Sequence, residues 1–135
     1  MRMADSRDII KFSDRAPIPL DSYVMGRSSS DDLFWVTGQV GRNPQTGAFV
    51  EGGFSRQFHQ AVDNLEGILN DAGLELGDVI YTWVQFIDPD DVDLMDDLYS
   101  ARFPDPKPAR TSYAVRGLWR EAVVQIAAVA QRRED

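Results

Sequence analysis

The residue best suited to hold a small anion is Arg110, in the segment Pro108-Ala109-Arg110-Thr111-Ser112. A guanidinium offers its N–H donors in a planar fork that matches a carboxylate. The proline-rich residues 104–108 stiffen the chain directly before an expected strand and would hold this side chain in place. An arginine at a strand start is more often part of a surface ion pair, so both interpretations stay open.

The sequence lacks the residues that most other catalytic mechanisms need. The chain of 135 residues contains no cysteine, which excludes disulfides, thiolate nucleophiles and sulfur-ligated metals. Its single histidine, His59, cannot build the usual zinc ligand set. Its place at the edge of a helical apolar stripe favours a structural boundary residue over a catalytic base. No nucleophile elbow, P-loop, dinucleotide fingerprint or EF-hand occurs. Arginine, backbone and hydroxyl groups and a held water remain, so we expect no metal and no cofactor.

An acidic run follows the strongest strand pattern, with aspartates at positions 88, 90, 91, 93, 96 and 97. A calcium loop alternates its ligands around a glycine at a sharp turn, and this run has no glycine. Asp88 can cap a helix, Pro89 fits its first position, and the acids suit the positive end of the helix dipole. We therefore interpret the run as a solvated helix start.

The net charge and the absence of long apolar runs limit the classes of expected partner. A formal net charge of −8 repels phosphate backbones, so we do not expect nucleic acid as a partner, although Arg116 and Arg120 lie close together. No apolar run approaches the roughly 20 residues that span a bilayer, and no signal peptide pattern opens the sequence. The expected partner is a small molecule, without a membrane, and the simplest location is cytoplasmic.

Apolar periodicity predicts the elements. Strands are expected at residues 8–12, 22–25, 33–38 and 48–50, with a polar loop at 26–32 and a hairpin turn at Asn43-Pro44-Gln45-Thr46-Gly47. Apolar residues at three- and four-residue spacing predict a helix from Phe54 to Ala72, which Gly73 ends. A strand at 79–87, a helix from Asp88 to near Phe103, and strands at 110–115 and 122–130 complete the order.

This order indicates one α+β domain over residues 1–135, with frayed ends at 1–7 and 131–135. Two helices cover only one face of a mixed sheet. The strands at 79–87 and 122–130 are nevertheless apolar on both faces. An uncovered apolar face of this size marks an interface. We therefore expect a homo-oligomer with ligand clefts between its subunits.

Several short motifs occur together in a fixed order. They are Thr37-Gly38-Gln39, the turn at 43–47, Asp63-Asn64-Leu65, Ala72-Gly73, Asp78-Val79 and Pro108-Ala109-Arg110-Thr111-Ser112. In this order the chain resembles the RidA/YjgF family of reactive-intermediate (enamine/imine) deaminases over about residues 9–130. The resemblance implies a chorismate-mutase-like α+β fold and a homotrimer with a barrel-like core and three clefts between subunits. It also implies hydrolysis of enamines or imines to 2-keto acids and ammonia, without metal or cofactor.

The resemblance assigns roles to individual residues. Arg110 would clamp the substrate carboxylate in a bidentate pair. Gly38 and the backbone of Ser112 would donate further hydrogen bonds. Thr37 stands where the family often has serine and would contact the substrate or a water. Tyr23 matches an aromatic residue of the cleft.

The chain also departs from the family. Where characterised members carry a glutamate that positions the attacking water, this chain has Gln125. An amide can orient a water but cannot exchange a proton near neutral pH. The cysteine that often follows the arginine is Ser112, and an asparagine of the second helix is Asp96, whose charge would repel a carboxylate in the cleft. Trp119 and Arg116 lie near the expected cleft mouth.

Three functions therefore stay open. The first is deamination of an enamine or imine of a small carboxylated metabolite, with Arg110, Gln125 and Thr37 as catalytic residues. The second is a trimer that binds small keto acids without deaminating them, or that runs a different reaction, because of Gln125. The third, ribonuclease activity, fits poorly with an acidic chain and a single histidine.

Overall fold

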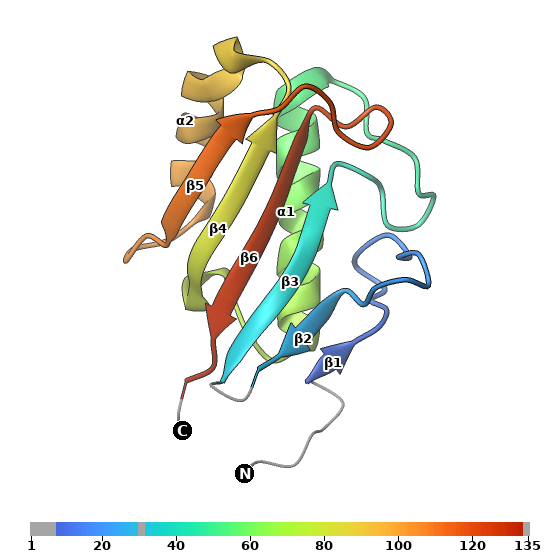
Figure 1. Cartoon of the computed structure of the whole chain (residues 1–135), viewed down its shortest axis with the longest axis vertical. Coiled ribbons are helices and arrows are strands. Elements are labelled where there is room, and N and C mark those ends of the chain that lie inside the picture. The colour runs from blue at the N-terminus through green and yellow to red at the C-terminus, as the bar shows by residue number, and fades with distance from the viewer. Residues whose placement is uncertain (1–7, 30–31, 134–135) are drawn as a thin grey trace.

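The computed structural model describes residues 8–29 and 32–133, which form a mixed six-stranded sheet with two α-helices (Figure 1). In chain order the elements are β1 (Ile9–Ile10), β2 (Gly26–Ser28), β3 (Leu33–Val40), α1 (Gly53–Asp71), β4 (Val79–Phe86), α2 (Val92–Arg102), β5 (Ala109–Ala114) and β6 (Val124–Gln131). The strand order is β1-β2-β3-β6-β4-β5, and only β4 and β5 pair in parallel. The predicted α+β class is confirmed.

Helix α1 follows its predicted apolar stripe. Its fully buried apolar side chains are Phe58, Ala61, Val62, Leu65, Ile68 and Leu69. They pack against the sheet together with Phe34, Val84 and Ile126, which are also fully buried. Gly73 has a φ of +79°, the left-handed conformation that ends helices and suits glycine. The helix therefore ends where the sequence predicts.

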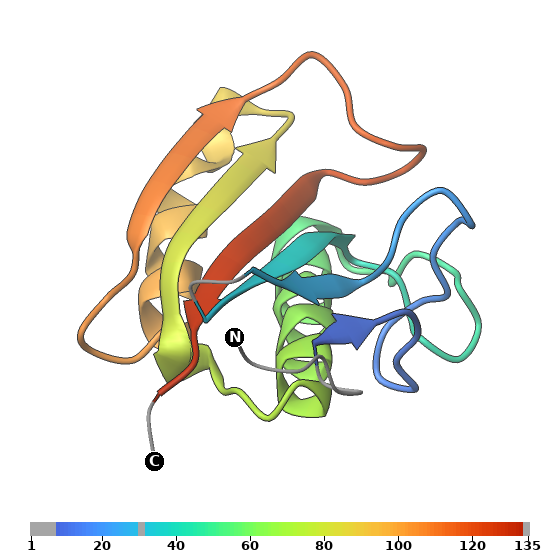
Figure 2. The ribbon, with the colours of Figure 1, turned by 60° about the horizontal axis from the view of Figure 1, so that its bottom comes forward.

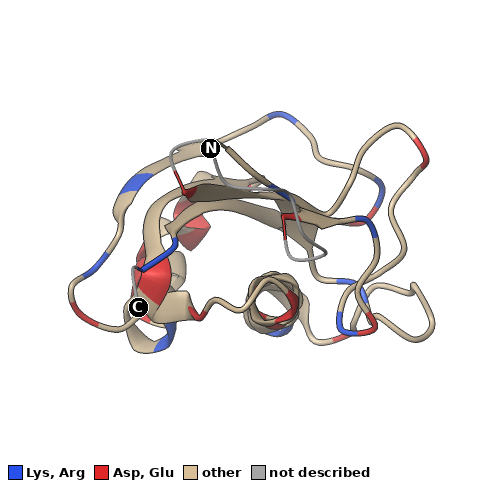
Figure 3. Ribbon diagram, turned by 90° about the horizontal axis from the view of Figure 1, so that it is seen from below, with Lys and Arg blue, Asp and Glu red and all other residues tan. Residues whose placement is uncertain are grey.

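The acidic run forms a helix start, as expected. Asp88 Oδ1 accepts a hydrogen bond from the backbone N–H of Asp90 at 2.9 Å, and Pro89 opens a short 3-10 turn (Pro89–Asp91) that leads into α2. Within residues 8–29 and 32–133, no group of three His, Asp or Glu side chains is placed to hold a metal ion. Figure 3 shows acidic residues along α2, on the same side of the sheet as α1.

The N-terminal strands differ from the prediction. The second strand is Gly26–Ser28 rather than residues 22–25, and the first is only Ile9–Ile10 rather than 8–12. A β-carbon on Gly26 would lie 2.3 Å from the Phe34 ring, so only glycine lets this strand pass over a buried aromatic residue. The glycine that helped to predict a loop at 26–32 is therefore required by close packing between paired strands.

The structure also differs from the prediction after the turn at 43–47 and at the C-terminal end. The turn at 43–47 forms, but its return at 48–50 makes only the single bridge Arg42↔Phe49 instead of a strand. The C-terminal end is ordered further than expected, because β6 reaches Gln131 and Arg132 Nη1 donates to the Ala72 carbonyl at 2.6 Å. Residues 1–7 and 134–135, also expected to fray, lie outside the described residues.

The face of the sheet opposite the helices is uncovered (Figure 3). Trp35 stacks on Trp83 with ring centroids 6.4 Å apart, and Tyr81 contacts Trp83 edge-on at 4.6 Å. Trp35 keeps 47% of its surface exposed. Gln85 and Gln125 lie further along the same face. In the described part of the chain, no helix is long and apolar enough to span a membrane.

Candidate active site

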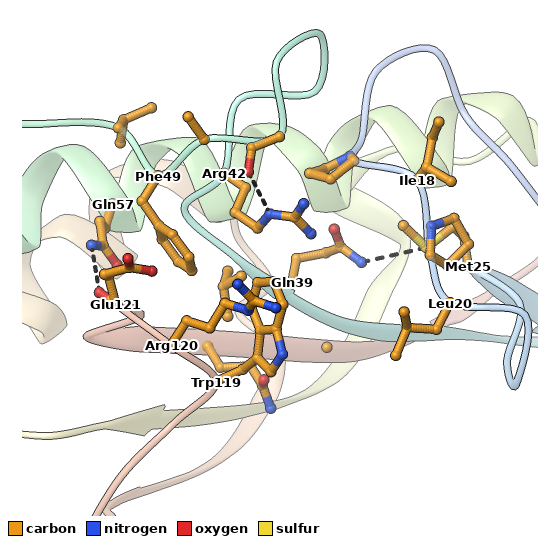
Figure 4. Close-up of a pocket in the computed structure, with 18 of the residues that line it drawn as sticks. Ile18, Leu20, Met25, Gln39, Arg42, Phe49, Gln57, Trp119, Arg120 and Glu121 are labelled. Atoms are coloured by element: carbon orange, nitrogen blue, oxygen red, sulfur yellow. Dashed lines mark hydrogen bonds between the residues drawn. The ribbon is translucent and has the colours of Figure 1, made fainter.

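A cavity of about 1040 Å³ lies beside β3 and β6. Its walls come from the segments that follow β1, β3 and β5, which gather at the side of the sheet away from α2 (Figures 1 and 2). Tyr23, Gly38, Trp119 and Gln125 line it, so it brings together these residues that the sequence predicted for the site. Figure 4 shows the cavity with its labelled lining residues.

Gly38 and Gln125 lie against each other in the lining of this cavity. The pairing of β3 with β6 shifts register between Val36 and Gln39, a bulge that contains Gly38. A β-carbon on Gly38 would lie 3.0 Å from the amide carbon and nitrogen of Gln125. Glycine at this position therefore lets the Gln125 side chain lie directly against the β3 backbone.

Gln125 belongs to a chain of polar side chains on the open face. Its Nε2 donates to Gln85 Oε1 at 2.7 Å, and Gln85 Nε2 donates to the Tyr113 hydroxyl at 2.7 Å. This chain fixes the Gln125 amide and leaves its carbonyl oxygen and one N–H for other partners. Such an amide can orient a water, but it cannot act as a general base.

Thr37 has a structural partner instead of a place in the cavity lining. Its hydroxyl donates to the Val24 carbonyl at 2.6 Å, and its N–H donates to the Met25 carbonyl at 2.9 Å. These bonds attach Val24 and Met25, which directly follow Tyr23, to β3. Thr37 therefore positions Tyr23, and its expected direct contact with substrate has no support from the cavity geometry.

Arg110 lies at the opposite edge of the sheet, on β5. Its Nη2 donates to Asp96 Oδ1 at 2.8 Å, and its guanidinium carbon lies 4.6 Å from the centroid of the Tyr99 ring. The Arg110 side chain is 24% exposed and that of Asp96 is 55% exposed. Arg110 therefore forms a surface ion pair, which was one of the two interpretations of this residue from the sequence. The exposed Asp96 carboxylate already occupies part of its guanidinium.

The Tyr99 ring packs against the Arg110 guanidinium. Its hydroxyl shares a hydrogen bond with Thr82 Oγ1 at 2.6 Å. Burial raises the pKa of the Tyr99 phenol above its ordinary value, although the Thr82 hydrogen bond and the nearby Arg110 charge act in the opposite direction. The ring stays neutral at physiological pH and offers the guanidinium a cation–π platform.

The strand register shows that Arg110 and Gln125 point to opposite faces of the sheet. Arg110 pairs with Thr82, which is buried toward α2, whereas Gln125 pairs with Gln85 on the open face. Paired residues on neighbouring strands project to the same face. Ser112 pairs with buried Val84 and so shares the face of Arg110. One chain thus carries two separate groups of predicted site residues and does not join them.

Some cavity residues were not predicted for the site. Arg42, Phe49 and Arg120 line the cavity around Trp119. The sequence offered one signal, the closeness of Arg116 and Arg120, but of these two only Arg120 lines the cavity. His59 lies away from it, with Nδ1 3.1 Å from Arg102 Nη1, which agrees with its interpretation as a structural residue at the edge of the α1 stripe.

Comparisons with known proteins give the class of this fold. The crystal structure of RidA from the Antarctic bacterium Psychrobacter superposes with a TM-score of 0.85 at 28% identity, covering 93% of this chain and 98% of that one. Escherichia coli TdcF with bound serine superposes with a TM-score of 0.82 at 26% identity, covering 92% and 98%. The chain therefore has the RidA/YjgF-type α+β fold.

Sequence comparisons give the same family as the structural comparisons. Residues 13–132 match the family described as Endoribonuclease L-PSP. The 2-iminobutanoate/2-iminopropanoate deaminase of Rattus norvegicus is 32% identical over 124 residues, 92% of this chain and 89% of the relative. A RutC family protein of Pyrococcus horikoshii is 33% identical over 121 residues, 90% and 95%. The chain belongs to the endoribonuclease L-PSP family, also called the RidA/YjgF family.

Proposed function

We propose that this protein hydrolyses an imine or enamine of a small carboxylated metabolite to a 2-keto acid and ammonia. The observation that carries the proposal is the similarity, over 92% of the chain, to a relative named as an imine deaminase. The chemistry of the described residues suits this reaction, because an intrinsically reactive substrate needs only an anchored carboxylate and a held water.

The proposed site is shared between two copies of the chain. Arg110 faces α2 at one edge of the sheet, and the cavity with Gly38 and Gln125 lies beside the other strands. A neighbouring copy whose β5 edge closes the cavity would supply the missing guanidinium. The uncovered aromatic face around Trp35 and Trp83 supports self-association. The proposed assembly is the homotrimer that the family resemblance implies.

In this mechanism Arg110 holds the substrate carboxylate and the imine carbon lies near Gln125. The Gln125 carbonyl accepts a hydrogen bond from a water, whose oxygen adds to the imine carbon. Solvent carries both protons of this water to the nitrogen, the C–N bond breaks as the C=O bond forms, and ammonia leaves. An enamine first takes a proton on carbon to give the imine. The serine bound by Escherichia coli TdcF fits a small ligand with a carboxylate.

A second function, the binding of small keto acids without deamination, is favoured by one observation. Gln125 cannot exchange protons near neutral pH, and one N–H of its amide already donates to Gln85. An assay that generates 2-iminobutanoate in situ separates the two functions. Wild-type protein is expected to accelerate loss of the imine. Stabilisation by 2-ketobutyrate in a thermal-shift experiment, with no acceleration, would instead establish the binder.

Replacing Gln125 with glutamate should raise the rate of imine hydrolysis at least about tenfold, because a carboxylate can take a proton from the attacking water. The measurement is kcat/KM for 2-iminobutanoate. Gln85→Glu is the matched control, since it adds the same charge to the same face next to Gln125. Equal gains in both variants would mean that added charge, rather than proton transfer at residue 125, changes the rate.

Replacing Asp96 with asparagine should tighten binding of 2-ketobutyrate about two- to fivefold. This factor corresponds to the interaction free energy of an exposed ion pair, which here competes with the ligand for Arg110. Titration calorimetry measures the change. Asp97→Asn removes the same charge from the adjacent exposed position and should leave the affinity within error. An unchanged affinity in Asp96→Asn would show that this carboxylate does not compete with the ligand.

A further inference from the structure

We infer that the cavity contains a second anion-binding subsite, formed by Arg42 and Arg120 around Trp119, and that it selects ligands with a second acidic group. This inference rests on the proposed function, in which Arg110 of a neighbouring copy holds the first carboxylate. The ligand class is a 2-keto or 2-imino acid whose side chain ends in a carboxylate.

The two guanidinium groups converge on one indole ring. The guanidinium carbon of Arg42 lies 4.8 Å from the Trp119 ring centroid, and that of Arg120 lies 4.6 Å from it. Phe49 packs against the same indole with centroids 5.9 Å apart. Figure 4 shows both arginines beside Trp119 within the cavity. A guanidinium that lies over a ring still offers the N–H donors at its edge, so this arrangement leaves donors for an anion.

Arg42 is held in position by the hairpin turn. Its Nε donates to the Gly47 carbonyl at 2.7 Å, which leaves the terminal amino groups for other partners. The Asn43 side chain fixes the turn by accepting from the N–H groups of Gln45 at 2.8 Å and Thr46 at 3.1 Å. Gly47 has a φ of +77°. A donor that is fixed before binding loses little conformational entropy when a ligand arrives.

Arg120 reaches the same ring through an uncommon backbone conformation. Its φ of +52° lies in the left-handed region, which side-chain-bearing residues rarely adopt. Such a conformation persists only where the surroundings determine it, and it often occurs at ligand sites. Here it accompanies the contact between the Arg120 guanidinium and Trp119.

Neither guanidinium is neutralised within the described part of the chain. Arg102, Arg110 and Arg133 form salt bridges with carboxylates, whereas no carboxylate of the described residues pairs with Arg42 or Arg120. Glu51 and Glu121 also line the cavity, but both lie outside ion-pair distance of these arginines. These acids weaken the general attraction for anions, so binding depends on a carboxylate that reaches the guanidinium donors directly.

The size of the cavity agrees with a longer ligand. Pockets of about 300–1,000 Å³ hold drug-sized molecules, and the volume here is about 1040 Å³. A keto acid of three or four carbons fills a small part of it. A neighbouring copy would take some of this space, so the two guanidinium groups, rather than the volume, carry the proposal.

The test compares two ligands of equal length by titration calorimetry, 2-oxoglutarate and 2-oxopentanoate, which differ in the terminal carboxylate. Wild-type protein should bind 2-oxoglutarate about tenfold more tightly, as expected for a charge-assisted contact. Arg42→Gln and Arg120→Gly should each remove most of this preference and leave the affinity for 2-oxopentanoate unchanged. Glycine suits the positive φ of residue 120, so this variant retains the fold. Arg116→Gln, an exposed arginine of the same loop outside the cavity lining, is the matched control and should keep the preference.

Equal affinity of wild-type protein for the two acids would overturn the proposal. An equal loss of preference in Arg116→Gln would also overturn it, because the effect would then come from overall charge. A parallel loss of both ligands in the Arg42 and Arg120 variants would overturn it too, as it would indicate a structural role. The proposed function fails separately: if imines are not hydrolysed but the preference for the diacid holds, the subsite stands and deamination does not.

Discussion

Replacement of Arg110 with alanine should lower kcat/KM for 2-iminobutanoate about 100- to 1000-fold, the loss expected when two charge-assisted hydrogen bonds to a carboxylate are removed. Lys107, which precedes β5 by two residues, is already engaged and cannot replace it. Lys107 donates to the carbonyl groups of Ser100, at 2.6 Å, and Phe103, where it caps the end of α2. Arg110→Lys should recover only part of the loss, because an ammonium keeps the charge without the planar fork.

The control for this variant is Arg102→Ala. Arg102 also lies on the helix side of the sheet and also pairs with a carboxylate, Asp63, at 2.6 Å. Its guanidinium is hydrogen-bonded to His59 and does not face the proposed site. Its loss should therefore lower the free energy of unfolding and leave kcat/KM unchanged. Full activity of Arg110→Ala, or equal losses in both variants, would contradict the role of Arg110 as the carboxylate clamp.

Two inactive variants should restore activity to each other when they are mixed. Arg110→Ala removes the guanidinium at the β5 edge. Gly38→Val disturbs the cavity of the same chain, because its β-carbon would lie 3.0 Å from the Gln125 amide. If each cleft takes one group from each of two copies, random reassembly of equal amounts gives about a quarter of the clefts both intact halves. About a quarter of wild-type activity should therefore return after joint refolding.

Each variant refolded alone is the control and should stay inactive. The clash at Gly38 falls on a side chain rather than on backbone, so the fold of Gly38→Val should be retained. Circular dichroism and size-exclusion chromatography check this retention. A refolded mixture that is no more active than the average of its two components would contradict a site shared between copies.

The regular elements were predictable because their patterns are local. The spacing of Phe58, Val62, Leu65 and Leu69 defines α1, and Asp88 marks the start of the second helical region. The short strand Gly26–Ser28 was missed because its cause is not local. Its glycine is required by the ring of Phe34, and that contact exists only once the strands have paired.

The site could be predicted only in part. Gly38, Tyr23 and Gln125 were selected by resemblance to a family, and Trp119 by its place near the expected cleft mouth. All four line one cavity. The contact of Arg110 with Asp96 depends on how α2 docks against β5, which residue spacing does not determine. Arg42 and Arg120 were missed because irregular loops have no period, and only the folded chain brings them to Trp119.

The uncovered aromatic face links the amount of this protein to its stability. In a proposed assembly that buries Trp35 and Trp83, association stabilises the folded chain by mass action, and the stabilisation grows with protomer concentration. At low abundance the dissociated chain would expose these rings to aggregation and its loosened parts to proteolysis. Synthesis and turnover would then set the number of complete clefts, so expression level itself would act on the activity.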